Sequence, residues 1–359
     1  MNPLFNQVLS SSADDRRDLF VTSARRLGTN ERNLEKDFWV CWSLDALFHE
    51  LPDGGPRLLF KGGTSLSKAF GLISRFSEDI DITVFRDDLG QGATVEELEA
   101  MSGKRRRAKL DQIRDSCRAY INGALRDDLG QILAEALKTA GQPLDAARLE
   151  PDPDDPDGQT LSLWYPSVTG APDDGGYIRP AVRIESGAKS ALDPNAPRTV
   201  VPYIAEDLGV ADFSIPGITT VEADRTLWDK VVILHGMRSW FEVRGEVRQE
   251  GQRITRHYYD VHRLVESPIR EDALGDLELA VDCSRHARMF FNRRDFRLEN
   301  AIPGSFTLTP VEGMLGALRG DYERMGGMIF GPVPEFEAVI RSIESFETAV
   351  NQAARPRAE

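Results

Sequence analysis

Cysteine is scarce in this chain: three cysteines occur in 359 residues, and they lie far apart. An odd number at wide spacing fits neither a disulfide framework nor a thiolate metal site. Cys41, Cys117 and Cys283 are therefore expected to be free thiols in a reducing, cytoplasmic compartment. Histidine is scarce as well, with five residues and no His-x-x-x-His pair, which argues against a zinc site.

Long apolar runs are also missing. No uncharged apolar stretch reaches the roughly 18 residues that a membrane-spanning helix needs. The first twenty residues lack the basic start, apolar stretch and small-residue cleavage site of a secretory leader. We therefore expect neither a membrane span nor secretion. The hydrophobic share of 41% is close to the ordinary globular range, so a sizeable core can form.

The chain has no excess of positive charge either; its formal net charge is −14. This argues against a uniformly basic nucleic-acid binder but allows a basic groove on an acidic body. Residues 104–118 hold seven basic residues against two acids, net +5, and residues 285–297 hold five arginines around Phe290 and Phe291. Such clusters can contact RNA phosphates and bases. The alternative is a solvated helix face whose charges are balanced by nearby acids.

The periodicity of the sequence divides the chain. Helical and strand-like segments alternate up to about residue 220, whereas the pattern from Glu222 onward is helical. The acid- and proline-rich stretch Glu150–Asp157 is expected to be a solvated loop. We predict an α+β protein: a mixed β-sheet flanked by helices over residues 1–220, and a C-terminal helical bundle over residues 221–359.

The most informative pattern is Phe60–Leu66 (FKGGTSL) followed by Arg75–Ile82 (RFSEDIDI). It predicts a strand, a glycine turn, a helix and a strand carrying Asp79 and Asp81 on one face, about 6.5–7 Å apart along it. Glycines before a helix allow close backbone approach and favour a phosphate. Two such carboxylates repel each other unless a cation lies between them, which suits Mg²⁺. Either feature alone is common on solvated strands and turns; only their combination is specific.

This combination resembles the DNA polymerase β-type nucleotidyltransferase superfamily, and residues 60–82 as a whole resemble the AbiEii/AbiGii toxin family of nucleotidyltransferases more closely. Further blocks of resemblance extend over most of the chain: Leu34–Val40, Glu185–Ala188, Ala223–Lys230, Arg256–Asp260, Asp321–Met325 and Pro334–Asn351. The resemblance implies a nucleotidyltransferase fold in the first domain. It also implies an enzyme that transfers a nucleoside monophosphate from an NTP and releases pyrophosphate.

The family's functional residues can be carried over to this sequence. Asp79 and Asp81 would bind Mg²⁺ or Mn²⁺. Glu185 would join them and help to deprotonate the acceptor hydroxyl; the alternative is an exposed strand acid. The resemblance assigns nucleotide binding to the Gly-Gly turn and its neighbours, with the hydroxyl of Thr64 or Ser65 on the terminal phosphates. The assigned residues are Lys61, Gly62, Gly63, Thr64, Ser65 and Arg256.

The helical part supplies further candidates. Lys230 resembles the family's motif lysine, which could reach phosphates as a point charge; alternatively its amine simply reaches water. Arg256 and Asp260 match a later basic–acidic motif, and Asp260 is assigned a catalytic role. His257 stands where many members have an acid, so it either takes part in acid–base chemistry or orients a neighbour.

Characterised members of the family are growth-arresting toxins of type IV-like toxin–antitoxin or phage-defence modules, and some modify the acceptor end of tRNA. The resemblance therefore implies an NTP substrate, a tRNA or other RNA acceptor, and a separately encoded antitoxin. Two alternatives stay open. The acceptor could be a protein or small-molecule hydroxyl, or the chain could be a catalytically silent NTP-binding protein, against which the intact pair of aspartates argues.

Overall fold

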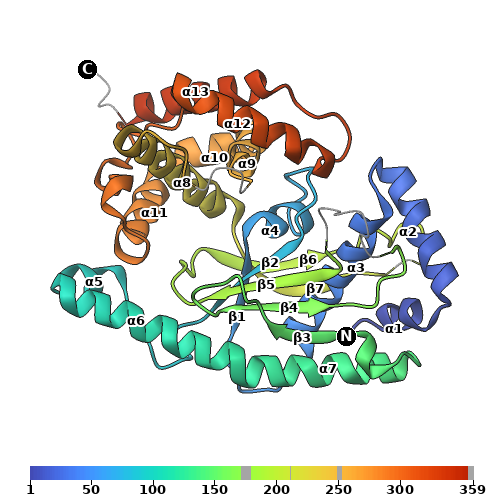
Figure 1. Ribbon diagram of the computed structural model, residues 1–359. Helices are drawn as coiled ribbons and strands as arrows, with labels where there is room; N and C mark the ends of the chain where they lie inside the picture. The colour runs from blue at the N-terminus through green and yellow to red at the C-terminus, as the bar shows by residue number, and fades with distance from the viewer. Residues whose placement is uncertain (171–178, 211, 249–252, 355–359) are drawn as a thin grey trace. The chain divides into compact units, whose positions relative to one another are not determined.

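The computed structural model describes residues 1–170, 179–210, 212–248 and 253–354 (Figure 1). The chain forms two compact units. Unit 1 comprises Met1–Phe70, Phe76–Ala93 and Ser102–Val221, and unit 2 comprises Gly71–Arg75, Thr94–Met101 and Glu222–Glu359. Two short segments thus belong to unit 2 although the chain on both sides of each belongs to unit 1.

Unit 1 is built on one seven-stranded sheet with the order β3-β4-β5-β2-β1-β7-β6. Its strands are β1 (Leu58–Lys61), β2 (Asp79–Val84), β3 (Arg148–Pro151), β4 (Thr160–Trp164), β5 (Ala181–Gly187), β6 (Asn195–Val200) and β7 (Ile215–Val221). β2 pairs parallel with β5 and β1 pairs parallel with β7, while the other neighbours are antiparallel. The mixed sheet and the helices around it confirm the predicted α+β fold class.

The alternation of apolar and charged residues determines how β2 lies in the sheet. Ile80 and Ile82 are fully buried, whereas Asp79 and Asp81 between them are half-buried. Because successive side chains of a strand point to opposite faces, the isoleucines enter the core and the carboxylates share the other face. Burial of the isoleucines therefore fixes the orientation of both aspartates.

The described residues of unit 1 form six α-helices: α1 (Pro3–Ser10), α2 (Ala13–Leu27), α3 (Glu31–Asp45), α4 (Gly62–Lys68), α6 (Gly103–Tyr120) and α7 (Arg126–Thr139). Helix α3 packs against β2, β5 and β7, and α6 packs against β5. Helix α4 is tied to α3 by a buried ion pair, in which Nζ of Lys68 lies 2.7 Å from Oδ1 of Asp37. This pair holds the helix that follows the glycine turn.

One prediction about the sheet was wrong. Glu150 and Pro151 were assigned to a solvated loop, but they are the last two residues of β3. β3 lies at the edge of the sheet, where a proline without an N–H group can end a strand because no further neighbour needs the missing hydrogen bond.

Unit 2 is helical, which confirms the predicted C-terminal bundle. Its helices are α5 (Val95–Ala100), α8 (Ala223–Arg244), α9 (Thr255–Val265), α10 (Ile269–Gly275), α11 (Leu277–Phe290), α12 (Glu312–Met325) and α13 (Phe336–Ala353). Helix α8 packs against α9 and α11, and α9 packs against α12 and α13. The core includes Trp228, whose ring stacks on that of Phe306. Within the described residues, no helix is long and apolar enough to span a membrane.

Candidate functional site

The two aspartates of β2 lie beside charged residues of both neighbouring strands. The register pairs Asp79 with Arg183 and Asp81 with Glu185 on β5, and it pairs Asp81 with Lys61 on β1. Residues paired in this way stand on the same face of adjacent strands, which are about 4.8 Å apart. The central strands of unit 1 thus place the three predicted carboxylates on one face of the sheet.

The glycine turn lies directly against this face. Gly62 has a φ of +81°, a conformation that favours glycine, and a Cβ atom at this position would lie 2.7 Å from Cγ of Asp81. Any side chain here would collide with the Asp81 carboxylate. Glycine fits this position for two reasons: the left-handed backbone conformation of the turn, and the close approach of the turn to the carboxylate.

The hydroxyl groups after the turn have partners inside unit 1. Thr64 is fully buried and its hydroxyl contacts Oγ of Ser77 at 2.8 Å and the carbonyl oxygen of Asp79. The hydroxyl of Ser65 donates to the carbonyl oxygen of Gly62 at 2.9 Å. In this arrangement the two side chains tie the turn to the start of β2. They stabilise the shape of the turn rather than presenting free hydroxyls to a phosphate.

Burial is the main effect on the charged form of Asp79. Burial, and after it the neighbouring Glu78, raises the pKa of Asp79, while Lys36 and Arg183 act in the opposite direction. Lys36 of α3 forms a buried ion pair with Glu78, with 2.7 Å between Nζ and Oε2. One lysine therefore compensates the acid next to Asp79 but does not remove the repulsion at Asp79 itself.

A divalent cation fits these donors. Asp79 and Asp81 supply hard oxygen ligands, and the pKa of Asp79 is raised chiefly by burial, so a bound cation would favour its charged form. Glu185 is at present engaged elsewhere, because its Oε1 lies 2.9 Å from a guanidinium nitrogen of Arg183. Among the described residues, no three His, Cys, Asp or Glu side chains converge as a complete metal-binding group. The pair of aspartates is the part of the predicted site that fits the ion.

The predicted residues of unit 2 form a separate cluster around Asp260. Arg75 binds this carboxylate with two hydrogen bonds, from Nε to Oδ1 at 2.7 Å and from an Nη to Oδ2 at 2.8 Å. Nζ of Lys230 lies 2.9 Å from Oδ2. Burial alone would raise the pKa of Asp260, but Arg75 and Lys230 outweigh it and lower this pKa. Asp260 is a fully buried, fully paired anion.

Basic residues act on Lys230 and His257 as well as on Asp260. Arg75 and Lys230 pair with the Asp260 carboxylate, and burial lowers the pKa of Lys230 against the opposing effect of Asp260. Burial, Lys230 and Arg256 lower the pKa of His257 well below its usual range, so its imidazole is neutral at pH 7. Nδ1 of His257 is buried and has no hydrogen-bond partner in the part of the chain that the structure describes. The cluster can accept an anion.

Sequence reasoning missed four residues of these two clusters, Arg183 of β5 among them. Arg75 and Glu78 lie inside the motif RFSEDIDI, but only its aspartates were assigned roles. Lys36 lies among Glu35 and Asp37 in an otherwise apolar helix, and all three are buried. Consecutive charged residues within an apolar helical segment were the one available indication, because such residues are rarely buried unless they are paired.

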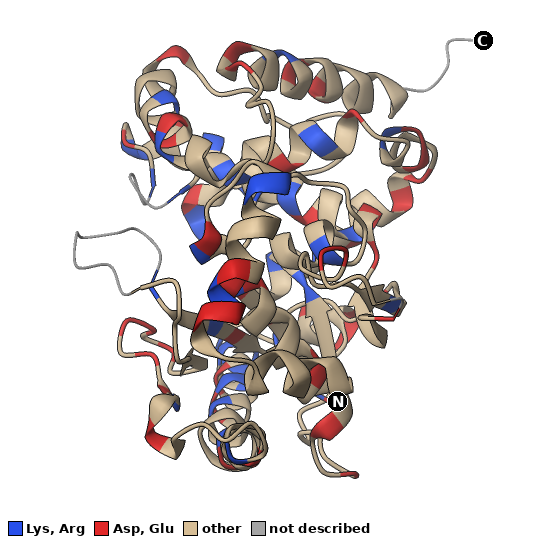
Figure 2. Ribbon diagram, turned by 90° about the vertical axis from the view of Figure 1, so that its right-hand side faces the viewer, with Lys and Arg blue, Asp and Glu red and all other residues tan. Residues whose placement is uncertain are grey.

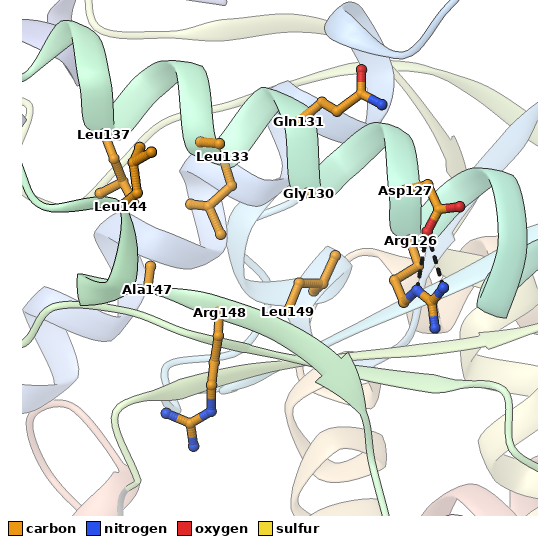
Figure 3. A pocket seen from close by; sticks show the side chains of 11 residues that line it. Arg126, Asp127, Gly130, Gln131, Leu133, Leu137, Leu144, Ala147, Arg148 and Leu149 are labelled. Carbon is orange, nitrogen blue, oxygen red and sulfur yellow. Dashed lines mark hydrogen bonds and ion pairs between the residues drawn. The ribbon is translucent and has the colours of Figure 1, made fainter.

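A hollow elsewhere in unit 1 contains none of the predicted residues. It has a volume of about 430 Å³ and lies between α7 and the edge strand β3 (Figure 3). Leucines from both elements line it, and an ion pair between Arg126 and Asp127 lies at one end. We assign no chemistry to it.

The comparisons with known proteins agree with the pattern of residues. No curated protein matches the sequence. Among solved structures, MenT4, a nucleotidyltransferase toxin from Mycobacterium tuberculosis H37Rv, is similar over 94% of this chain and 99% of its own, with 15% identity and a TM-score of 0.32. At that TM-score we base no conclusion on the likeness. The family model described as nucleotidyl transferase AbiEii toxin, type IV TA system, matches residues 45–352. The match covers most of the chain, which therefore belongs to the AbiEii family of nucleotidyltransferase toxins of type IV toxin–antitoxin systems.

Proposed function

We propose that the protein transfers a nucleoside monophosphate from an NTP to a hydroxyl group of RNA, the 3′ end of tRNA being the preferred acceptor, in a reaction that requires Mg²⁺. The observation that carries this proposal is the pair Asp79 and Asp81 on one strand face, with Gly62 directly beside it. Family membership supplies the reaction class, and the geometry supports the place where it occurs.

The carboxylates of unit 1 would hold the cation. Asp79 and Asp81 are its ligands, and Glu185 becomes the third when it leaves Arg183. When bound, the ion neutralises phosphate charge and lowers the cost of the charge that develops on the leaving group. Glu185 accepts the proton of the attacking hydroxyl, so the oxygen can attack the α-phosphorus in line. The new oxygen–phosphorus bond forms as the bond to the β-phosphate breaks, and pyrophosphate leaves.

Backbone and basic groups would hold the triphosphate. The turn at Gly62 and Gly63 is narrow because it lacks side chains, which allows phosphate oxygens to approach the main chain, and Lys61 precedes it. In unit 2, Lys230 pairs with Asp260, and Arg256 lies close enough to His257 to lower the pKa of that imidazole; these residues form a cluster of their own. Asp260 itself acts by fixing Lys230 rather than by contacting substrate, since both of its oxygens are occupied.

Labelled nucleotides test the proposal directly. Purified protein is incubated with Mg²⁺, each α-labelled NTP in turn, and total tRNA or lysate. We expect label on tRNA with at least one NTP, loss of label with Asp81→Asn, and unchanged label with the control Asp88→Asn. Asp88 is an exposed residue shortly after the same strand, where it pairs with Arg57.

The other outcomes distinguish the alternatives. Label on protein rather than RNA would assign a different acceptor to the same chemistry. Absence of label with every NTP, or equal label from Asp81→Asn, would contradict the assigned site. As a companion measurement, Asp79→Ala should abolish the growth arrest caused by expression of the wild-type chain.

A further inference from the structure

The start of α6 has an unusual charge distribution. Residues 104–107 are four consecutive basic residues in the first turn, and this turn contains no acid. The N-terminal end of a helix carries partial positive charge, so cations there are electrostatically unfavourable. Nothing in the folding of α6 accounts for this arrangement, because Ser102 already caps the helix by accepting from the backbone N–H of Arg105.

Three of these basic side chains face solvent without a counter-charge. Lys104, Arg105 and Arg107 are exposed, and none of them has an ion-pair partner among the described residues. One turn further along, Ala108 follows Lys104 and Lys109 follows Arg105, so neither has the acid that usually stabilises an exposed basic helix face. Asp111 follows Arg107, but its carboxylate pairs with Arg114. The buried residues of α6, Ile113 and Cys117, lie on the opposite side of the helix.

The second half of the same helix is different. Arg114 lies 3.1 Å from Asp111 and 3.0 Å from Asp115, and Arg118 lies 3.3 Å from Asp115. These arginines are neutralised within the helix. The sequence shows one cluster of net charge +5 over residues 104–118, but the structure confines its uncompensated charge to the first half. On many other elements, acidic and basic residues are interspersed (Figure 2).

We infer that Lys104, Arg105 and Arg107 form a docking surface for the phosphate backbone of an RNA acceptor, an inference that rests on the RNA acceptor proposed above. None of the exposed large apolar side chains of the described chain lies on α6. A surface that binds another protein usually has an apolar centre, whereas a surface that binds a phosphate backbone needs only exposed cations. The bare basic surface therefore favours a polyanion over a protein partner.

Binding measurements without NTP test this surface separately from catalysis. The affinity of the full chain for fluorescent tRNA is measured by anisotropy between about 50 and 200 mM salt. Arg105→Gln/Arg107→Gln is compared with Arg114→Gln/Arg118→Gln, which removes the same charge from the same helix. We expect the first variant to bind about tenfold or more weakly and to reduce the slope of log K against log salt by nearly 2. The second should leave the slope nearly unchanged.

Equal losses in the two variants would overturn the inference, because net charge alone would then explain them. Unchanged tRNA binding in Arg105→Gln/Arg107→Gln, with loss of antitoxin binding, would also overturn it and assign the surface to a protein. Both pairs of residues are exposed or half-buried, and thermal melting confirms that the variants fold. If the wild-type protein neither transfers label to RNA nor binds RNA, the proposal of an RNA acceptor is wrong. If the wild-type protein labels and binds RNA, and Arg105→Gln/Arg107→Gln binds RNA equally well, only the inference of the docking surface is wrong.

Discussion

The carboxylates of unit 1 and the carboxylate of unit 2 have opposite surroundings. Around Asp79 and Asp81, acids gather on one strand face, burial and Glu78 raise the pKa of Asp79 against Lys36 and Arg183, and Lys36 is itself paired with Glu78. Asp260, by contrast, is one acid among several bases and its pKa is lowered. An acid with unsatisfied charge keeps its affinity for a cation, whereas a fully paired acid has none left. On this difference we base the proposed roles: Asp79 and Asp81 as cation ligands, and Asp260 as a positioning residue.

The largest effect is expected for Asp81→Asn. Loss of this ligand should lower the rate of nucleotide transfer about 1000-fold, because cation stabilisation of the transferring phosphoryl group contributes several kcal/mol. The free energy of unfolding should stay the same or rise, since the substitution removes a repelling charge. Initial rates of label transfer and urea unfolding measure the two quantities. A large loss of stability would show that Asp81 is a structural acid like Asp260.

Asp260→Asn, unlike Asp81→Asn, should lower the stability of the protein. Removing this charge takes the Asp260 carboxylate away from the buried Arg75 and Lys230, which should cost about 3 kcal/mol or more of stability. Urea unfolding of the variant measures the loss. The control is Glu266→Gln, a more exposed acid just after α9, which should change stability by less than about 0.5 kcal/mol. Full stability with lost activity would instead place Asp260 in the chemistry.

Gly62→Ala tests the closeness of the turn to the carboxylates. The new methyl group would collide with Asp81, so we expect activity to fall about 10- to 100-fold through displacement of that carboxylate, with a strain of about 1–3 kcal/mol. The matched control is Gly54→Ala, which has a φ of +84° but no atom within 4 Å of the new methyl group. It should share the strain and keep the activity. Equal activities would mean that Asp81 is not held by the turn.

A smaller, pH-dependent effect is expected at His235 in α8. Burial lowers its pKa, and its Nδ1 accepts a hydrogen bond from the backbone N–H of Thr307 at 3.2 Å. A histidine whose folded pKa is depressed contributes stability above its unfolded pKa and loses that contribution as the pH falls through the folded value. Between pH 7 and 5, His235→Gln should therefore lose less stability than the wild type, by at most about 1.4 kcal/mol per pH unit. Identical pH slopes in thermal unfolding would contradict the lowered pKa.

Parts of the candidate site could be predicted because they depend on local pattern. The alternation at Asp79–Ile82 determines which side chains enter the core, and the two glycines indicate the narrow turn. The partners of these residues could not be predicted in the same way. Lys36 meets Glu78 across 42 positions of the chain, and Arg75 meets Asp260 across 185. Such pairs depend on how distant segments pack together, and this packing produces no periodic pattern in the sequence.

The sequence by itself determined the fold class, the strand that carries the aspartates and the family, because each depends on residue type at short spacing. The tertiary structure alone decided which charges are compensated. It turned Glu185 towards Arg183 and placed Arg75 with unit 2 although Asp79, four residues later, belongs to unit 1. It also paired Arg114 and Arg118 of α6 with acids. The physical reason is that charge compensation depends on distances of a few ångströms between side chains, and for distant residues only the folded chain sets those distances.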